Sequence, residues 1–166
     1  MKPAVFLSLG FMLAMAAPPP VHAADPQLSL RIQLEEELSI PDESGNLKVV
    51  RKKVASSEPG DVLVYTLVYT NNGGAAVADA KVEDPVPAGT ILLPGSVLGE
   101  EAEIRFSVDG GKTYAPFPVE VEVEGPDGAK VRKKAPADSY THIRWTAKTP
   151  LGPGESRSAS FKVIVQ

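Results

Sequence analysis

Apolar and polar side chains alternate through most of the chain, and this alternation predicts β-strands. The strongest case is Val62–Thr70, nine residues that are all apolar, aromatic or Thr and rich in β-branched side chains. Turn-forming residues bound it, with Pro59-Gly60-Asp61 before it and Asn71-Asn72-Gly73-Gly74 after it. Both faces of this strand are largely non-polar. We therefore expect a central strand that is covered on both sides.

Shorter segments with the same period of two lie before this strand. Leu28–Leu34 alternates as a half-buried strand and leads into the acidic triplet Glu35–Glu37. The next segment, Asn46–Ser57, is typical of an edge strand, because its basic side chains discourage pairing with a foreign chain. Those side chains are Lys48, Arg51, Lys52 and Lys53.

Five more strands are predicted downstream, separated by Gly and Pro turns. They are Thr90–Leu93, Glu103–Val108, Pro118–Glu124, Thr141–Ala147 and Ser158–Val165. Pro94-Gly95 is expected to close the first of them. In Pro118–Glu124, we expect Val119, Val121 and Val123 to face the core and the intervening Glu side chains to face solvent.

Beyond the first 23 residues, no segment has the apolar spacing of a helix. The series of strands and turns predicts an all-β protein, an antiparallel immunoglobulin-like β-sandwich of about seven to nine strands after an N-terminal signal helix. Phe106, Trp145 and Phe161 are expected to help cover the central strand. The expected organisation is a signal peptide at 1–23, an N-terminal strand and linker at 24–46, and the sandwich at 47–166.

The first 23 residues have the layout of a secretory signal peptide. Lys2 supplies a positive charge, Val5–Ala17 is an apolar run, and Val21-His22-Ala23 fits a cleavage site between Ala23 and Ala24. The alternative is a transmembrane anchor, but this run spans only about 20 Å as a helix, against roughly 30 Å of bilayer hydrocarbon. We expect a secreted or periplasmic protein with no membrane insertion after signal cleavage.

Cleavage would leave a chain with no Cys, no Met and one His, His142. Without Cys there is no disulfide framework, and without soft or imidazole ligands a copper-handling sandwich is disfavoured. The mature chain would carry 16 basic and 21 acidic residues. This acidic balance excludes nucleic acid as an expected partner, because such binding needs a basic patch.

Three acidic clusters could in principle carry chemistry: Glu35–Glu37, Asp79–Asp84 and Glu120–Glu124. We interpret the first as a solvated face. We interpret the third as a solvated sheet face too, because no His or Asn joins its carboxylates. Paired carboxylates can act as acid and base, so Asp79, Glu83 and Asp84 keep a hydrolase open as an alternative. No Gly-x-Ser-x-Gly motif occurs, and His142 is the only imidazole base. We expect no catalytic residue, cofactor or metal ligand.

An ordered series of turns resembles the domain of unknown function 11, a bacterial and archaeal repeat domain. The matching positions are Pro59-Gly60-Asp61, Tyr65, Asn72-Gly73, Asp84–Gly89 and Pro153-Gly154-Glu155, spread over about residues 47–166. This resemblance implies an immunoglobulin-like β-sandwich and a place in cell-surface or secreted proteins. Family members commonly occur as tandem copies, whereas this sequence holds one.

A local resemblance concerns the turn Ser107–Tyr114, which matches the Asp-box pattern of sialidases and other β-propellers. In those proteins the motif is a structural hairpin away from the active site, so the resemblance implies a structural turn here. A calcium site at Asp109 would need six to eight oxygen ligands, and the motif offers one carboxylate.

Together these observations predict an exported, non-catalytic immunoglobulin-like domain with a structural, adhesion or protein-binding role in the bacterial envelope. A protein partner is expected to bind through an edge strand. A pilus-type periplasmic chaperone would need a second domain. The alternative function is an envelope hydrolase or carbohydrate-binding module that uses surface carboxylates. The oligomeric state does not follow from the sequence.

Overall fold

The computed structural model describes residues 28–126 and 128–166. The predicted signal peptide and its cleavage point between Ala23 and Ala24 lie outside the described residues. The described chain is all-β, as predicted, with ten strands in three antiparallel sheets and one short 3-10 turn at Ala137–Ser139. No helix in this part of the chain is long and apolar enough to cross a membrane.

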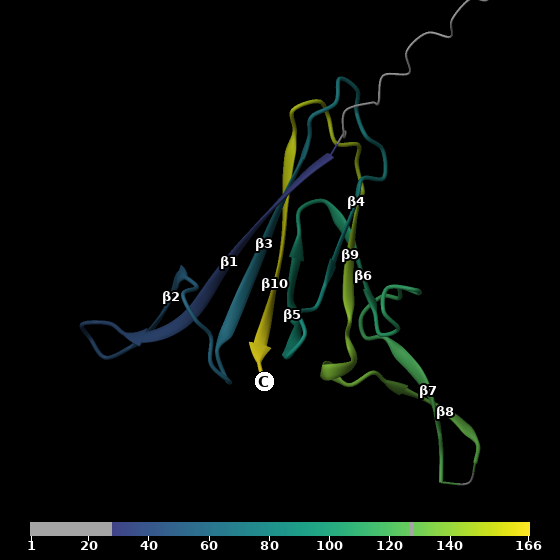
Figure 1. Ribbon diagram of the computed structural model, residues 1–166. Helices are drawn as coiled ribbons and strands as arrows, with labels where there is room; N and C mark the ends of the chain where they lie inside the picture. The colour runs from purple at the N-terminus through teal and green to yellow at the C-terminus, as the bar shows by residue number, and fades with distance from the viewer. Residues whose placement is uncertain (1–27, 127) are drawn as a thin grey trace, which may run out of the picture.

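The larger sheet has five strands in the order β2-β1-β3-β10-β5. Their bounds are Leu47–Lys53 for β2, Leu28–Pro41 for β1, Val62–Asn71 for β3, Ser156–Val165 for β10 and Thr90–Gly99 for β5. The second sheet has the order β4-β9-β6, with bounds Lys81–Pro85, His142–Ala147 and Ala102–Ser107. Figure 1 shows the two sheets side by side, with β1 and β2 on the side away from the second sheet.

One buried core lies between the two sheets. Leu67 on β3 and Phe161 on β10 contribute from the larger sheet, and Ile143 and Trp145 on β9 contribute from the smaller one. The rings of Trp145 and Phe161 meet across the core with their centroids 6.1 Å apart. This two-layered arrangement is compatible with a β-sandwich.

The predicted central strand is confirmed as β3, which lies between β1 and β10. The expectation that both of its faces are covered is only partly right. The face with Leu63, Leu67 and Tyr69 is buried in the core. The opposite face looks away from the second sheet, and there Val68 is 37% exposed, whereas Val64 is buried.

The strand that begins at Thr90 is longer than predicted. Pairing with β10 breaks after Leu93, as the turn residues Pro94-Gly95 suggested, but it resumes at Leu98 and Gly99. Residues 94–97 of β5 therefore lie opposite a single residue of β10, Phe161. Ser96 stabilises this bulge, since its Oγ donates to Leu93 O at 2.6 Å and accepts from Lys162 N at 2.8 Å.

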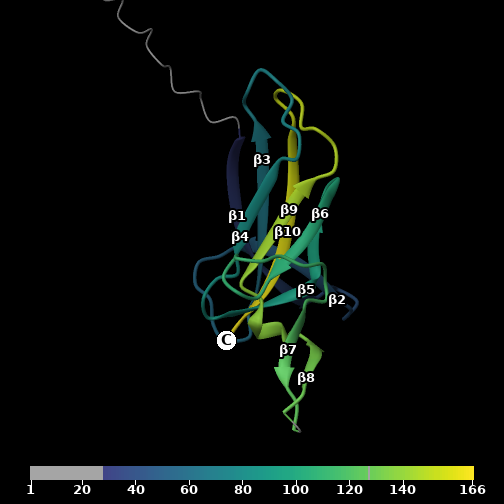
Figure 2. The same ribbon diagram turned by 90° about the vertical axis from the view of Figure 1, so that its right-hand side faces the viewer.

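The two remaining strands form a separate ribbon of β7, Glu120–Glu124, and β8, Lys130–Lys134. Figures 1 and 2 show this ribbon extending away from both sheets. The prediction that the valines of this segment face the core is confirmed for Val119, which is buried in the core, and for Val121, which is partly buried and packs against it. Val123 lies farther along the ribbon and is only half-buried, outside the core cluster. The described chain has ten strands because β4 and β8 add to the eight segments that were predicted as strands.

Candidate functional site

The most distinctive surface of the larger sheet is an open edge along the first half of β1. This strand pairs with β3 over Leu28–Glu37, but it pairs with β2 only over Glu35–Pro41. Within the described part of the chain, residues 28–34 therefore have a strand neighbour on one side only. Unpaired backbone groups on a sheet edge are a template for another strand.

The hydrogen bonds of the sheet fix which residues of β1 face this edge. Asn71 N donates to Glu155 O, so odd-numbered residues of β3 direct their backbone groups toward β10. Even-numbered residues of β3, such as Thr70, face β1, where Thr70 pairs with Ser29. Backbone direction alternates along a strand. The N–H and C=O groups of Leu28, Leu30, Ile32 and Leu34 therefore point outward to the open edge.

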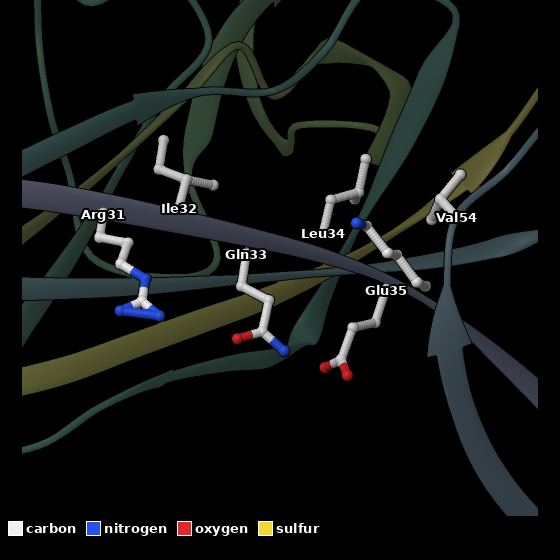
Figure 3. A pocket seen from close by; sticks show the side chains of 7 residues that line it. Arg31, Ile32, Gln33, Leu34, Glu35 and Val54 are labelled. Carbon is white, nitrogen blue, oxygen red and sulfur yellow. The ribbon is translucent and has the colours of Figure 1, made fainter.

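The side chains of these residues form an apolar row. The row lies on the face of β1 that continues the core-facing side of β3. Leu30 is 47% exposed and Ile32 is 48% exposed, because the second sheet does not reach this part of β1. Figure 3 shows Ile32, Leu34 and Val54 on one side of the strand, with Arg31, Gln33 and Glu35 on the other. An exposed apolar row beside unpaired backbone groups is what a bound strand requires.

A groove of about 470 Å³ lies where β2 leaves β1. Its lining comes from β1, from Arg31 to Glu35, and from Lys53 and Val54 at the end of β2. Arg31 is exposed and takes part in none of the ion pairs found among the described residues. The groove therefore has apolar side chains in its wall and, beside them, the positive charge of Arg31, which is outside these ion pairs.

The open segment of β1 ends at the acidic triplet Glu35–Glu37, where pairing with β2 begins. Glu36 is 6% exposed and lies 3.3 Å from Lys52 Nζ, so its predicted place on a solvated face was wrong. Glu37 accepts from Lys162 Nζ at 2.6 Å and lies 3.5 Å from Arg51 Nε. The hydrogen bond from Lys162 is the main cause of a lowered pKa at Glu37. The ion pairs of Lys52 and Arg51 fasten β2 to β1 beyond residue 34, and that of Lys162 ties β1 to β10.

The predicted carboxylate cluster at Asp79–Asp84 is not brought together as an acid and base pair. Glu83 accepts hydrogen bonds from Tyr114 Oη at 2.7 Å and Arg144 Nε at 2.8 Å, and the first of these mainly lowers its pKa. Asp84, the next residue on the strand, points to the opposite face, where burial raises its pKa. Asp79 lies in the preceding turn, with a φ of 50°.

The Asp-box turn has the structural role that its resemblance implies. Asp109 Oδ1 accepts from Ser107 Oγ at 2.7 Å and from the N–H of Thr113 at 2.9 Å, and Oδ2 accepts from Thr113 Oγ1 at 2.6 Å. The hydroxyl of Thr113 is the largest cause of the strongly lowered pKa of Asp109. Tyr114 then docks the turn on Glu83, with the Arg144 guanidinium 3.5 Å above its ring centroid.

His142 lies beneath this turn and is partly buried. A Cβ added at Gly111 would lie 3.4 Å from the ring, and Nδ1 is buried without a hydrogen-bond partner. The structure places no nucleophile or carboxylate in hydrogen-bond contact with this ring among the described residues.

The third acidic cluster faces basic side chains across the ribbon. Glu120, Glu122 and Glu124 pair in register with Lys134, Arg132 and Lys130. Lys130 Nζ lies 3.6 Å from Glu122 Oε2. Opposite charges on paired strands stabilise the ribbon modestly. Within the described residues, no group of three or more His, Cys, Asp or Glu is placed to hold a metal ion.

Comparison with known proteins finds no matching family model, no matching curated protein and no matching solved structure. The candidate site therefore rests on geometry. The sequence correctly placed β2 at an edge, but the open part of the edge belongs to β1. No sequence signal marks it, because alternation gives the direction of a side chain and not what covers it.

Proposed function

We propose that this chain is an exported, non-catalytic immunoglobulin-like β-sandwich domain that binds another polypeptide in the bacterial envelope. Binding occurs by addition of an extended strand to residues 28–34 of β1. The observation that carries this proposal is the open edge itself. It combines outward-facing backbone groups with the half-exposed side chains of Leu30 and Ile32.

The immunoglobulin-like assignment is supported by the two sheets that share the Trp145–Phe161 core and by the turns of the family resemblance. Gly60, Gly89 and Gly154 each have a φ between 73° and 99°, a range that glycine adopts readily. These glycines lie in three of the four turns on which the resemblance to the domain of unknown function 11 rests. Export is supported by the signal-peptide pattern in the sequence of residues 1–23.

The alternative of a hydrolase or carbohydrate-binding module is less well supported. It requires surface carboxylates that are free to meet a substrate, and Glu83 is already held by Tyr114 and Arg144. Asp84 faces the other side of β4, so the two groups do not converge on one reacting atom.

A paired co-purification from the native envelope fraction tests the proposed function. The bait is the mature chain, and the edge variant carries Leu30→Lys and Ile32→Lys. The matched control is Leu98→Lys on β5, where the side chain is 65% exposed. We expect the wild type and the control to retain a bound protein that the edge variant loses. Equal retention by all three would contradict binding at β1.

A further inference from the structure

We propose that the strand added at this open edge carries an acidic residue between two apolar residues, and that its carboxylate pairs with Arg31. The partner is thus an extended polypeptide segment whose apolar, acidic and apolar residues lie opposite Leu30, Arg31 and Ile32. This inference rests on the proposed function, because it names the chemistry of the partner at the same edge. Charge decides the choice, since the apolar row alone would accept any segment of suitable shape.

Arg31 lies in surroundings that offer it no negative charge. It is exposed and takes part in none of the ion pairs found among the described residues. Its neighbours on the same face of the sheet are all uncharged, namely Ser29 and Gln33 along β1 and Thr66, Val68 and Thr70 on β3. The remaining side of Arg31 is the open edge. An added strand is therefore well placed to supply the counter-charge.

Glu35 is the nearest acidic residue of β1 on this face, but it does not neutralise Arg31. Four residues of strand separate the two side chains by about 13 Å. Salt screens exposed charges that are farther apart than about 10 Å. Lys53 also lies directly opposite Glu35 in the register of β1 and β2. The charge that an added strand meets between residues 29 and 33 is therefore that of Arg31.

Strand pairing brings the two proposed charges close together. The added strand runs antiparallel to β1, as β2 does farther along the same side. The backbone groups of Leu30 and Ile32 point outward, so these residues form hydrogen-bonded pairs with the partner. Arg31 then occupies the non-hydrogen-bonded pair between them, in which the Cα atoms are about 4.5 Å apart and the side chains are closest. A carboxylate opposite Arg31 is within reach of its guanidinium.

The space beside β1 limits the length of the partner segment. Val54 follows the end of β2 and lines the groove together with Ile32 and Leu34, so it narrows the space opposite Leu34. The five positions opposite residues 29–33 are not paired with β2. Apolar partner residues opposite Leu30 and Ile32 cover side chains that are 47% and 48% exposed. The segment therefore reads polar, apolar, acidic, apolar, polar.

Two capped peptides test the charge preference by amide NMR on the purified mature chain. Acetyl-Thr-Thr-Val-Glu-Val-Thr-Thr-amide carries the proposed pattern, and in the second peptide Lys replaces Glu. We expect the acidic peptide to shift the amide signals of residues 28–34. Its dissociation constant should be about fivefold lower than that of the Lys peptide. Equal affinity of the two peptides would overturn the acidic preference and leave strand addition standing.

Arg31→Glu should reverse this preference, so that the Lys peptide binds about fivefold more tightly than the acidic one. Arg31 is exposed and outside the ion pairs, so the fold should tolerate the change. Lys48→Glu is the matched control, because it changes the net charge equally at an exposed position of β2 outside the open segment. The control should keep the wild-type preference. An unchanged preference in Arg31→Glu, or a reversal in Lys48→Glu as well, would overturn the pairing with Arg31.

Methylation of the peptide backbone separates strand addition from a simple attraction of charges. The two Val residues of the acidic peptide lie opposite Leu30 and Ile32, and their N–H groups donate to β1. N-methylation of both Val residues should abolish the shifts. N-methylation of the Glu residue should preserve them, because its N–H points away from β1. Equal binding by the two methylated peptides would overturn the proposed seating.

The two proposals fail in different ways. Absence of any shift at residues 28–34 with either peptide, up to millimolar concentration, would overturn the acidic pattern. Loss of the envelope partner from the variant with Leu30→Lys and Ile32→Lys would still leave strand addition standing. Retention of that partner by the variant, together with absence of the shifts, would overturn both.

Discussion

The two halves of the larger sheet have the same alternation of apolar and polar residues but very different surroundings. On β3, Leu67 and Tyr69 are 0% and 1% exposed. Their register partners on β1 are Ile32 and Leu30, which are about half exposed. The difference arises because a sheet of three strands faces a sheet of five and leaves Leu30 and Ile32 on β1 uncovered, while β5 at the other margin is covered. Alternation therefore fixes which face a side chain occupies, while the width of the facing layer fixes its burial.

The largest difference between these halves should appear when apolar side chains are removed. Trp145→Ala deletes a ring that is 1% exposed, and it should lower the free energy of unfolding by about 4 kcal/mol. Ile32→Ala should cost less than about 1 kcal/mol, because half of that side chain is already in water. Urea unfolding of the monomeric chain at low concentration measures both. Similar losses would mean that β1 is covered in solution.

A smaller effect should follow from adding one methyl group on the covered side. A Cβ at Gly99 would lie 2.5 Å from Trp145 Cδ1, so Gly99→Ala should displace the indole and cost about 2 kcal/mol. Gly95→Ala is the matched control in the same strand, since a Cβ there would meet nothing within 4 Å. Thermal unfolding compares the two variants. Equal melting temperatures would contradict the tight packing at Gly99.

Glu37 lies on the face of the larger sheet that points away from the core. Glu37→Gln should lower the free energy of unfolding by about 1 kcal/mol, because it removes the charge that pairs with Lys162. The pKa of Glu37 is lowered below its ordinary value of 4.5, so its contribution is present above that pH and is lost as the pH falls through the lower folded-state value. The free energies of unfolding of the wild type and the variant should therefore become equal at acid pH. A constant difference from neutral pH down to pH 2 would refute the assignment.

The smallest effect has the opposite sign. Burial raises the pKa of Asp84, so its charged form destabilises the fold at neutral pH, and this cost disappears as the pH falls through the raised value. Asp84→Asn should raise the melting temperature at neutral pH by about 1–2 °C. The gain should shrink toward acid pH. A lower melting temperature at neutral pH would show that the attraction between Asp84 and His142 outweighs burial.

Much of the architecture could be predicted from local chemistry. Turn residues and a period of two located β3, β6, β9 and β10 to within a few residues, because both signals act over short stretches of backbone. The continuation of β5 past Pro94 could not be predicted from local sequence. It depends on a hydrogen bond that the backbone N–H of Lys162, on the distant strand β10, donates to Ser96 Oγ. The buried position of Glu36 likewise depends on Lys52 of the neighbouring strand.

The candidate site was less predictable than the fold. The sequence indicated an edge at residues 46–57 from its lysines, and β2 does lie there. It gave no indication that β2 ends its pairing at Glu35 and leaves the preceding residues open. Such a boundary is set by where one strand diverges from another. It is a property of two segments and is not encoded in either one alone.

The bulge in β5 has a consequence for assembly. Regular strands add best to regular strands, and residues 94–97 interrupt the ladder at the far margin of the larger sheet. That margin is therefore a poor template, whereas the margin at β1 is a good one. The outer edge of β2 carries basic side chains that discourage pairing with another chain. The open segment of β1 is therefore the favourable place on the larger sheet for a strand to join, and its occupation leaves no equivalent segment. The proposed edge pairing would thus serve recognition without the repeated strand addition that produces fibrils.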